Sequence, residues 1–313
     1  MAGGIGMITS ICMNPSFDKT VEVDTLMVGE VNRIRAMRQD VGGKGINVAV
    51  VARRLDLPVR CVGCAGRDGV ETVRNALDRE KIEHEFVTVN GAVRTNTKIV
   101  SGDGKGVTEL NEPGAQMTDA ELEEFFSLVE RKAKDSDYMV LTGSMPPGCA
   151  PETYRDLMRR AGNVPCVLDV GGAALNIGAE AKPFLIKPNL QELQESIGME
   201  LRTMRAIRDA ATIYLRKGVQ HVVVSMGSMG AMYVGEETSI FAPALRVKVG
   251  STVGAGDAMI GGLLKGLSKE KSVARAFRYG VAAGAASVMT EGTQLIVPAD
   301  FLNLLDQVRV QEV

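Results

Sequence analysis

Short apolar stretches alternate with longer helical stretches over most of the chain, and this alternation constrains the fold more than any other feature. It predicts an α/β core of three layers, in which helices cover both faces of a mainly parallel sheet. Strands are expected at residues 7–13, 59–64, 138–142, 166–169, 184–187 and 222–225. Helices are expected at residues 46–55, 69–79, 119–132, 151–161, 190–197, 204–217, 256–267 and 273–289.

Two segments, residues 20–40 and 94–110, break this alternation. Both are polar and strand-like and lack an intervening helix. In an α/β protein, such β insertions fold over a ligand as a lid or provide a dimer surface. Exposed strand edges in a lid favour pairing with a second subunit. We therefore expect one domain over residues 1–313 that carries a small β lid and forms a homodimer.

The charge balance limits the class of partner. The 313 residues carry a formal net charge of −2, and the sequence pI is about 5.9. Nothing here favours nucleic acid or an anionic membrane, so any phosphate site must be local. No apolar run approaches the roughly 18 residues that span a bilayer. Residues 1–6 lack the basic flank and hydrophobic stretch of a secretion signal. We expect a cytoplasmic protein.

Cysteine and histidine usage disfavours several kinds of site. The five cysteines form no disulfide framework. Cys61 and Cys64 match C-x-x-C, but they lie in an apolar run that predicts a buried strand, so free buried thiols are favoured over zinc. Only two histidines are present, which disfavours histidine-dependent hydrolysis and multi-histidine metal sites. His221 begins an expected strand and is expected to be structural.

The segment 251–267 carries the strongest functional signal. Gly254, Ala255 and Gly256 lead into an apolar helix, and Asp257 lies at its start. Small residues allow a ligand close to the backbone, and the free N–H groups of a first helical turn bind anions. An acid there could accept a proton, an arrangement that suits phosphoryl transfer to an alcohol. The alternative is that Asp257 is an ordinary N-cap.

A second glycine-rich segment, residues 42–49, also opens a helix. It is not a P-loop, because Gly45 follows Lys44 where a P-loop requires Ser or Thr. The functional hypothesis is that a sugar approaches the backbone at Gly43, that Asn47 binds its hydroxyls and that Lys44 meets a phosphate. The alternative is a flexible turn with a solvated lysine.

Three weaker signals surround these segments. Asp18 follows the first strand, where a carboxylate at the strand's carboxyl end could bind two sugar hydroxyls; the alternative is an Asx turn. Asn189 and Glu192 lie on one face of a first helical turn and could hold hydrated Mg²⁺ near nucleotide phosphates; the alternative is a capping arrangement.

The remaining candidates are a nucleotide turn and a row of polar residues. Ser225, Gly227 and Gly230 fall at a strand end and tight turn that could receive a nucleotide. Three polar residues alternate along one face of the second β insertion, facing either a pocket or solvent. They are Arg94, Asn96 and Lys98.

In order and spacing, five motifs together resemble the ribokinase-like superfamily, and more narrowly its pfkB (phosphofructokinase B) branch. They are Asn-Pro-x-x-Asp at 14–18, Gly-Gly-Lys-Gly-Ile-Asn-Val-Ala at 42–49, Thr-Gly-Ser-Met-Pro-Pro-Gly at 142–148, Lys-Pro-Asn-x-x-Glu at 187–192 and Ser-Thr-Val-Gly-Ala-Gly-Asp at 251–257. The resemblance spans residues 7–300. It implies a ribokinase-like α/β core, a β lid that often dimerises, and the use of ATP and Mg²⁺.

The resemblance also implies roles for individual residues. Asp257 would be the base, and three main-chain amides would contact the transferred phosphoryl group: Gly254, Ala255 and Gly256. The sugar would be bound by Asp18, Gly43, Asn47 and Ser144. Its phosphate would lie near Lys44 and Arg94, with Arg33 acting across a dimer. ATP would lie along Lys187, Ser225, Gly227 and Gly230, and Mg²⁺ near Asn189 and Glu192. A potassium site near Thr252 and Gly292 is a further implication.

Within this branch, the motifs favour a kinase of a ketohexose phosphate. Lys44 and residues 183–189 resemble 1-phosphofructokinases, and Lys44 also resembles tagatose-6-phosphate kinases. Residues 251–253 and 280–284 resemble the minor 6-phosphofructokinase type instead. Arg94-Thr95-Asn96 departs from the Arg-Ile-Asn that is usual in 1-phosphofructokinases.

Three alternatives from other functional classes stay open at this point. A kinase of an unphosphorylated sugar or nucleoside would leave Lys44 and Arg94 without an anion. A sugar-phosphate-binding regulator would perform no chemistry, which the intact Asp257 disfavours. A nicotinamide oxidoreductase would need a G-x-G-x-x-G fingerprint, which the sequence lacks.

Overall fold

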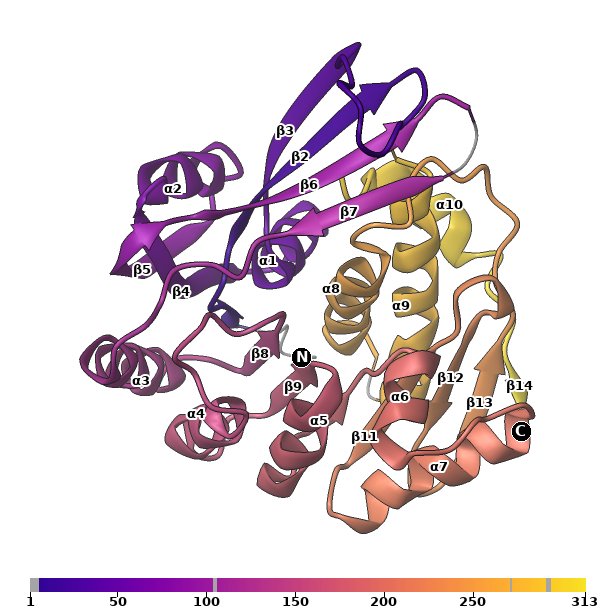
Figure 1. Ribbon diagram of the computed structural model, residues 1–313. Helices are drawn as coiled ribbons and strands as arrows, with labels where there is room; N and C mark the ends of the chain where they lie inside the picture. The colour runs from indigo at the N-terminus through magenta and orange to yellow at the C-terminus, as the bar shows by residue number, and fades with distance from the viewer. Residues whose placement is uncertain (1–5, 104–105, 271, 291–293) are drawn as a thin grey trace.

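A mixed sheet runs through the centre of the protein (Figure 1). The structure is a computed structural model that describes residues 6–103, 106–270, 272–290 and 294–313. Within them, ten strands form the sheet in the order β14-β13-β12-β11-β10-β9-β8-β1-β4-β5. Seven are mutually parallel: β1 Ile8–Cys12, β4 Val59–Asp68, β5 Glu83–Ala92, β8 Tyr138–Thr142, β9 Cys166–Asp169, β10 Leu185–Ile186 and β11 His221–Ser225. Three continue one edge antiparallel: β12 Ala231–Val234, β13 Ser239–Ala242 and β14 Gln311–Glu312.

Helices cover both faces of this sheet, as the alternation predicts. One face is covered by α1 Lys44–Arg54, α2 Val70–Arg79, α8 Ala255–Leu267, α9 Val273–Val288 and α10 Pro298–Leu305. The other is covered by α3 Asp119–Ala133, α4 Thr153–Ala161, α5 Gly172–Gly178, α6 Leu190–Ile197 and α7 Met204–Arg216. Successive strand residues point to opposite faces, so Val223 packs in the first layer and Val222 and Val224 in the second. The three-layer α/β/α prediction is confirmed.

Some strands and helices were not predicted from the sequence. All six expected strands and all eight expected helices are present, with ends shifted by a few residues. The edge strand β5 was missed because its solvent side is polar. The strands β12, β13 and β14 and the helix α10 were also missed. Helix α5 contains two glycines in seven residues, which weakens its helical pattern.

A second, four-stranded sheet, here called the lid sheet, projects from the core (Figure 1). Its order is β3-β2-β6-β7, with β2 Ser16–Val23, β3 Ala36–Gly42, β6 Arg94–Ser101 and β7 Val107–Asn111. The expected insertion at 94–110 matches β6 and β7. The expected insertion at 20–40 is too short, because β2 begins at Ser16 and β3 ends at Gly42.

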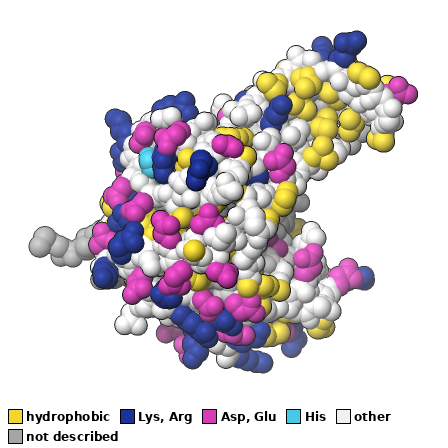
Figure 2. All heavy atoms as spheres, turned by 60° about the vertical axis from the view of Figure 1, so that its left-hand side comes forward, with side chains coloured by type: hydrophobic (Ala, Val, Ile, Leu, Met, Phe, Trp, Pro, Cys, Tyr) yellow, Lys and Arg dark blue, Asp and Glu magenta, His cyan; other side chains and the backbone are white. Residues whose placement is uncertain are grey.

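The lid sheet leaves several apolar side chains exposed, and Figure 2 shows hydrophobic side chains gathered along this projecting arm. Val28 and Val31 are 95% and 88% exposed. On β7, Val107 and Leu110 are each 58% exposed. In the segment that joins β2 to β3 and at the start of β3, Met27, Ile34 and Met37 are exposed together with Val28 and Val31. We call these five residues the lid patch. Contiguous exposed apolar surface of this kind marks an interaction site.

Other sequence expectations concern buried groups. Cys61 and Cys64 are buried, free thiols within β4. The His221 ring packs edge-on against Phe184, and its Nδ1 lies 3.0 Å from the Tyr233 hydroxyl, which fits the expected structural role. No helix among the described residues has the length and apolar character to cross a membrane.

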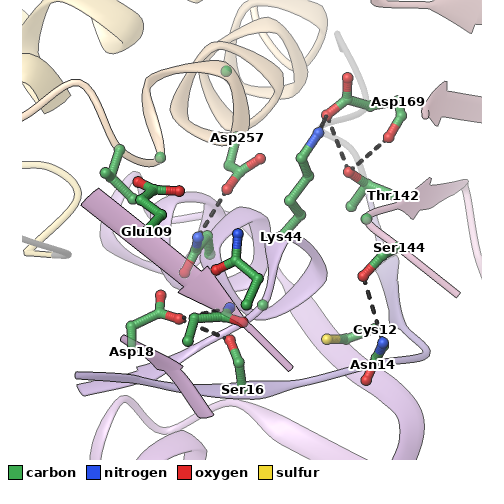
Figure 3. A pocket seen from close by; sticks show the side chains of 18 of the residues that line it. Cys12, Asn14, Ser16, Asp18, Lys44, Glu109, Thr142, Ser144, Asp169 and Asp257 are labelled. Carbon is green, nitrogen blue, oxygen red and sulfur yellow. Dashed lines mark hydrogen bonds and ion pairs between the residues drawn. The ribbon is translucent and has the colours of Figure 1, made fainter. Parts of the chain in front are cut away.

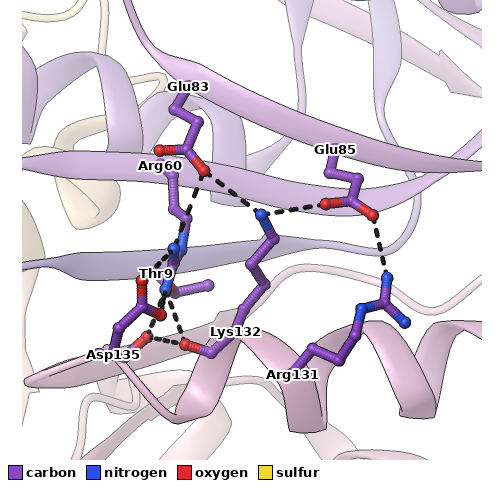
Figure 4. A network of polar contacts seen from close by, with 8 residues as sticks. Thr9, Arg60, Glu83, Glu85, Arg131, Lys132 and Asp135 are labelled. Carbon is purple, nitrogen blue, oxygen red and sulfur yellow. Dashed lines mark hydrogen bonds and ion pairs between the residues drawn. The ribbon is translucent and has the colours of Figure 1, made fainter.

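A buried arginine joins the amino-terminal ends of the central strands (Figure 4). On β4, Arg60 donates from Nε to Thr9 Oγ1 at 2.8 Å and from a terminal nitrogen to the Lys132 carbonyl at 2.7 Å. It also donates to both carboxylate oxygens of Asp135. These contacts tie β1, β4 and the end of α3 together, and they leave the guanidinium well satisfied despite its burial.

This network generates a stability prediction. We expect Arg60→Met to lower the free energy of unfolding by about 2–4 kcal/mol, because the buried Thr9 hydroxyl and the Lys132 carbonyl lose their donor and the ion pair with Asp135 is lost. Arg131 contacts Glu85 at 3.0 Å but is 57% exposed, so Arg131→Met should cost less than about 1 kcal/mol. Urea denaturation of the two variants makes the comparison. Equal costs would contradict the structural role assigned to Arg60.

Candidate active site

A cavity of about 550 Å³ lies between the core and the lid sheet (Figure 3). Its core wall is formed at the carboxyl ends of parallel strands, where open α/β sheets place their ligands. The strand-end residues that line it are Cys12 of β1, Thr142 of β8, Asp169 of β9 and Ser225 of β11. Two further parts of its wall come from the first turns of α1 and α8 and from three strands of the lid sheet.

Asp257 faces this cavity from the first turn of α8. The N-cap of that helix is Gly254 in a left-handed conformation, so the alternative that Asp257 is the N-cap is wrong. Its carboxylate accepts a 2.8 Å hydrogen bond from Asn47 Nδ2 and is only 4% exposed. Burial raises the pKa of Asp257 to about 6; nearby Lys44 opposes this rise and Asp169 adds to it. A carboxylate with this pKa can accept a proton near neutral pH.

The start of α8 also presents main-chain donors. The first i−4 hydrogen bond of this helix runs from the Ala258 N–H to the Gly254 carbonyl, so the Gly256 and Asp257 N–H groups before it are available to an anion. The Ala255 N–H instead donates to the Thr252 carbonyl at 3.5 Å, and Ala255 does not line the cavity. Gly254 and Gly256 line the cavity. A Cβ on Gly256 would lie 3.1 Å from Lys187 Nζ, so glycine leaves room for the lysine at this helix start.

Lys44 and Asn47 enter the cavity from α1. The helix begins at Lys44 after Gly43, whose φ is 120°, so the lysine occupies a fixed helical position. Lys44 Nζ lies 3.5 Å from Asp169 Oδ2. The Asp169 charge raises the pKa of Lys44, which holds the ammonium charged. The alternative of a flexible turn is therefore wrong, because Lys44 begins a helix, but its side chain is still 43% exposed.

Asp169 is the main residue of the site that the sequence reasoning missed. It ends β9, is 1% exposed, and lies 3.0 Å from Lys187 Nζ as well as 3.5 Å from Lys44. Its Oδ2 also accepts a 3.0 Å hydrogen bond from the Thr142 hydroxyl. Burial alone would raise its pKa, but the two lysines and these hydrogen bonds hold the pKa below its ordinary value. Its position at the carboxyl end of an expected strand was the available signal.

The lid sheet supplies the opposite wall. Asp18 lies within β2 and not at the end of a core strand, so both that expected placement and the Asx-turn alternative are wrong. Its Oδ1 accepts hydrogen bonds from Ser16 Oγ at 2.8 Å and Asn96 Nδ2 at 3.2 Å. It still lines the cavity, because β2 crosses over the core edge.

The expected row of polar residues on β6 faces the cavity, so the alternative of a solvated face is wrong. Among the described residues, Arg94 Nε and Asn96 Oδ1 are buried without a hydrogen-bond partner. Burial lowers the pKa of Arg94. Lys98 lies 4.0 Å from Glu109 on β7. The other lining residues that were not predicted from the sequence are Cys12, Asn14, Ser16, Glu109, Asn111, Thr142, Gly143 and Val253.

Asn189 and Glu192 both line the cavity and form a complete capping box at the start of α6. Asn189 Oδ1 accepts from the Glu192 N–H, and Glu192 Oε2 accepts from the Asn189 N–H, each at 2.8 Å. The alternative that these two residues cap the helix is therefore correct. It leaves one Glu192 oxygen outside the box, so the carboxylate can still serve a hydrated cation.

The other expected site residues divide into two groups. Ser144, Lys187 and Ser225 line the cavity. Gly227 and Gly230 flank the turn after β11 and do not line it. Arg33 is exposed near the end of the lid sheet, also outside the lining. For the expected potassium site, Thr252 is exposed and Gly292 lies outside the described residues.

Comparisons with known proteins agree with this architecture. Residues 11–300 match the model of the pfkB family of carbohydrate kinases. The 1-phosphofructokinase of Vibrio cholerae is 34% identical over 305 residues, 97% of this chain and 96% of that protein. Phosphofructokinase-2 of Escherichia coli, solved in complex with potassium, is 28% identical with a TM-score of 0.88, covering 97% of this chain and 99% of that one. A ribokinase from Thermotoga maritima, at 24% identity, shares the fold with a TM-score of 0.81 over 96% and 99% of the two chains.

The contacts of Asp257 generate a titration prediction. We expect its carboxyl group to titrate near pH 6 in ¹³C NMR, and Asn47→Ala to raise that midpoint by about one unit. The amide stabilises only the ionised acid, so its loss favours the protonated form. Asn96→Ala is the matched control, because Asn96 contacts Asp18 instead. An unchanged midpoint in Asn47→Ala would contradict the assigned hydrogen bond.

Proposed function

The chain belongs to the pfkB family of carbohydrate kinases, and from that premise we propose that it acts as a 1-phosphofructokinase. The reaction transfers the γ-phosphoryl group of ATP to fructose 1-phosphate and yields fructose 1,6-bisphosphate and ADP. The observation that carries the proposal is that one cavity combines a buried acid with a pKa of about 6, a helix amino terminus and cationic side chains. The identity with the Vibrio cholerae 1-phosphofructokinase supports the choice of substrate.

Asp257 performs the proton transfer in this mechanism. The primary hydroxyl oxygen of the sugar attacks the γ-phosphorus, the bond from that phosphorus to the β–γ bridging oxygen breaks, and ADP leaves. The hydroxyl proton passes to the Asp257 carboxylate, which its raised pKa suits for this purpose. The main-chain N–H groups of Gly254 and Gly256, which line the cavity, stabilise the charge on the transferred group. The surrounding walls keep water from taking the place of the sugar.

Different residues of the cavity wall bind the sugar phosphate and ATP. Asp18, Gly43, Asn47 and Ser144 bind the sugar hydroxyls, while Lys44 and Arg94 hold its phosphate. The buried, unpartnered Arg94 Nε and Asn96 Oδ1 support a polar ligand on the lid side, because such atoms are costly to leave unsatisfied. ATP lies along Lys187 and Ser225, with Gly227 and Gly230 shaping the adjoining turn.

Asn189 and Glu192 fit a magnesium ion held through water, since one Glu192 oxygen is outside the capping box. Mg²⁺ would neutralise charge on the ATP phosphates. Potassium near Thr252 is supported by the potassium complex of the Escherichia coli relative. The same relative has been solved with fructose-6-phosphate, so a 6-phosphofructokinase is the second candidate, followed by a tagatose-6-phosphate kinase.

A coupled assay of ADP release tests the substrate. We expect kcat/KM for fructose 1-phosphate to exceed that for fructose 6-phosphate, tagatose 6-phosphate and free fructose by about tenfold or more, because Lys44 and Arg94 need a correctly placed anion. Asp257→Asn is the control, with a rate about 10²–10⁴-fold lower and ATP binding preserved. Retention of more than roughly a tenth of the rate would reject this base. Preference for another sugar would reassign the substrate, and absence of ADP release would favour a regulator.

The lid patch supports a homodimer through the lid sheet. We expect Val31→Asp to weaken self-association by about tenfold or more in sedimentation experiments, since a buried unpaired charge opposes docking. Leu302 on α10 is 61% exposed, and Leu302→Asp is the matched control that should leave self-association unchanged. A monomeric native protein, or equal behaviour of both variants, would contradict the proposal. Arg33 lies beside this surface in sequence and would act on the partner's sugar phosphate.

A further inference from the structure

Asp169 contacts two lysines that come from different elements of the cavity wall. Lys44 begins α1, beside the proposed sugar site, and Lys187 follows β10, beside the proposed ATP site. Their ammonium nitrogens lie 3.5 and 3.0 Å from different oxygens of the same carboxylate. Figure 3 shows the Lys44 side chain turned toward Asp169 and away from Asp257.

Because Asp169 is buried, its charge depends on these contacts with the two lysines. A fully buried carboxylate is stable only with opposite charge and hydrogen bonds around it. Both are present, because the Thr142 hydroxyl donates to Oδ2 while the two lysines flank the group. The Asp169 charge is also the largest influence on the pKa of Lys44.

Asp257 is a second carboxylate within the influence of the same lysines. Both lysines lower its pKa and Asp169 raises it, so the two acids compete for one pair of cations. If Asp169 were neutral, the lysines could pair with Asp257. That pairing would make Asp257 a weaker base and would occupy the oxygen that a sugar hydroxyl must reach.

We propose that Asp169 is a positioning residue that holds Lys44 and Lys187 away from Asp257, so that Asp257 stays free to accept the substrate proton. Each lysine then keeps its remaining N–H groups for phosphate. The proposal rests on the proposed function for the proton transfer, but the charge competition exists without substrate. Across the cavity, the lid sheet contributes Asp18, Arg94, Lys98 and Glu109.

The test is the ¹³C NMR titration of Asp257 in the protein without substrate or divalent cation. The Asp257 carboxyl signal is assigned by its loss in Asp257→Asn. We expect the midpoint near 6 to fall by about one unit or more in Asp169→Asn, because the Asp169 charge is lost and the released lysines then stabilise ionised Asp257. We also expect kcat for sugar phosphorylation to fall about tenfold or more.

Thr142→Val is the matched control, since it removes one hydrogen bond to Asp169 but leaves its charge. It should move the Asp257 midpoint by less than about 0.3 unit. The direct effect of losing the Asp169 charge is measured by comparing Lys44→Met with Lys44→Met/Asp169→Asn, in which Lys44 cannot be released. Asp169→Asn should lower the midpoint less in this background than in the native protein, and an equal fall in both backgrounds would overturn the proposal.

An Asp257 midpoint that does not fall on loss of Asp169 overturns the proposal, whatever happens to the rate. A rate loss without a midpoint shift would instead indicate a purely structural role. The outcome is separate from the proposed function, which native ADP release with sugar phosphates tests. A native protein without kinase activity would reject that function. The competition of Asp169 and Asp257 for the two lysines would then be tested by the titration alone.

Discussion

The site depends on the close packing of α8 against α1. Asp257 and Asn47 are 210 residues apart in the chain, yet their side chains share a 2.8 Å hydrogen bond. The two helices approach this closely because α8 carries glycine at the contact. A Cβ on Gly261 would lie 2.4 Å from Val51 Cγ1. Lys265 of α8 also donates to the Leu55 carbonyl at the end of α1, at 2.6 Å. Both ends of the helix pair are therefore fixed, and the acid and amide with them.

How far the sequence predicts the site depends on whether the signal is local. Asp257 and Lys44 each follow a glycine-rich turn at a helix start, so a few neighbouring residues identify them. Asp169 has no such motif. Its role becomes visible only when Lys44 and Lys187, from two other elements, are brought to the same carboxylate. Strand periodicity predicts where β9 ends but says nothing about which lysines reach it.

The cavity residues of the lid sheet were also harder to predict, because their positions depend on how distant segments pair. The residue row on β6 could be found from alternation alone, but Glu109 enters the cavity only because β7 pairs with β6 and sets it opposite Lys98. Asp18 was expected at the end of a core strand, and the chain instead starts a new strand at Ser16. Asn189 and Glu192 show the opposite case, in which a capping signal was correct and the two residues still line the cavity.

The lid sheet leaves the core along one narrow line, since Ser16 pairs with Gly42 on one side and with Arg94 on the other. A tilt of the lid sheet about that line would therefore move these three paired strands together. At about 3.3 Å per residue, Asp18 lies about 7 Å from the pivot and the end of β2 about 23 Å from it. A displacement of about 3 Å at the far end becomes about 1 Å at Asp18, which is the scale on which substrate alignment affects rate. A contact at the distal end of the arm would thus shift the Asp18 side of the cavity by a smaller distance than the arm itself moves.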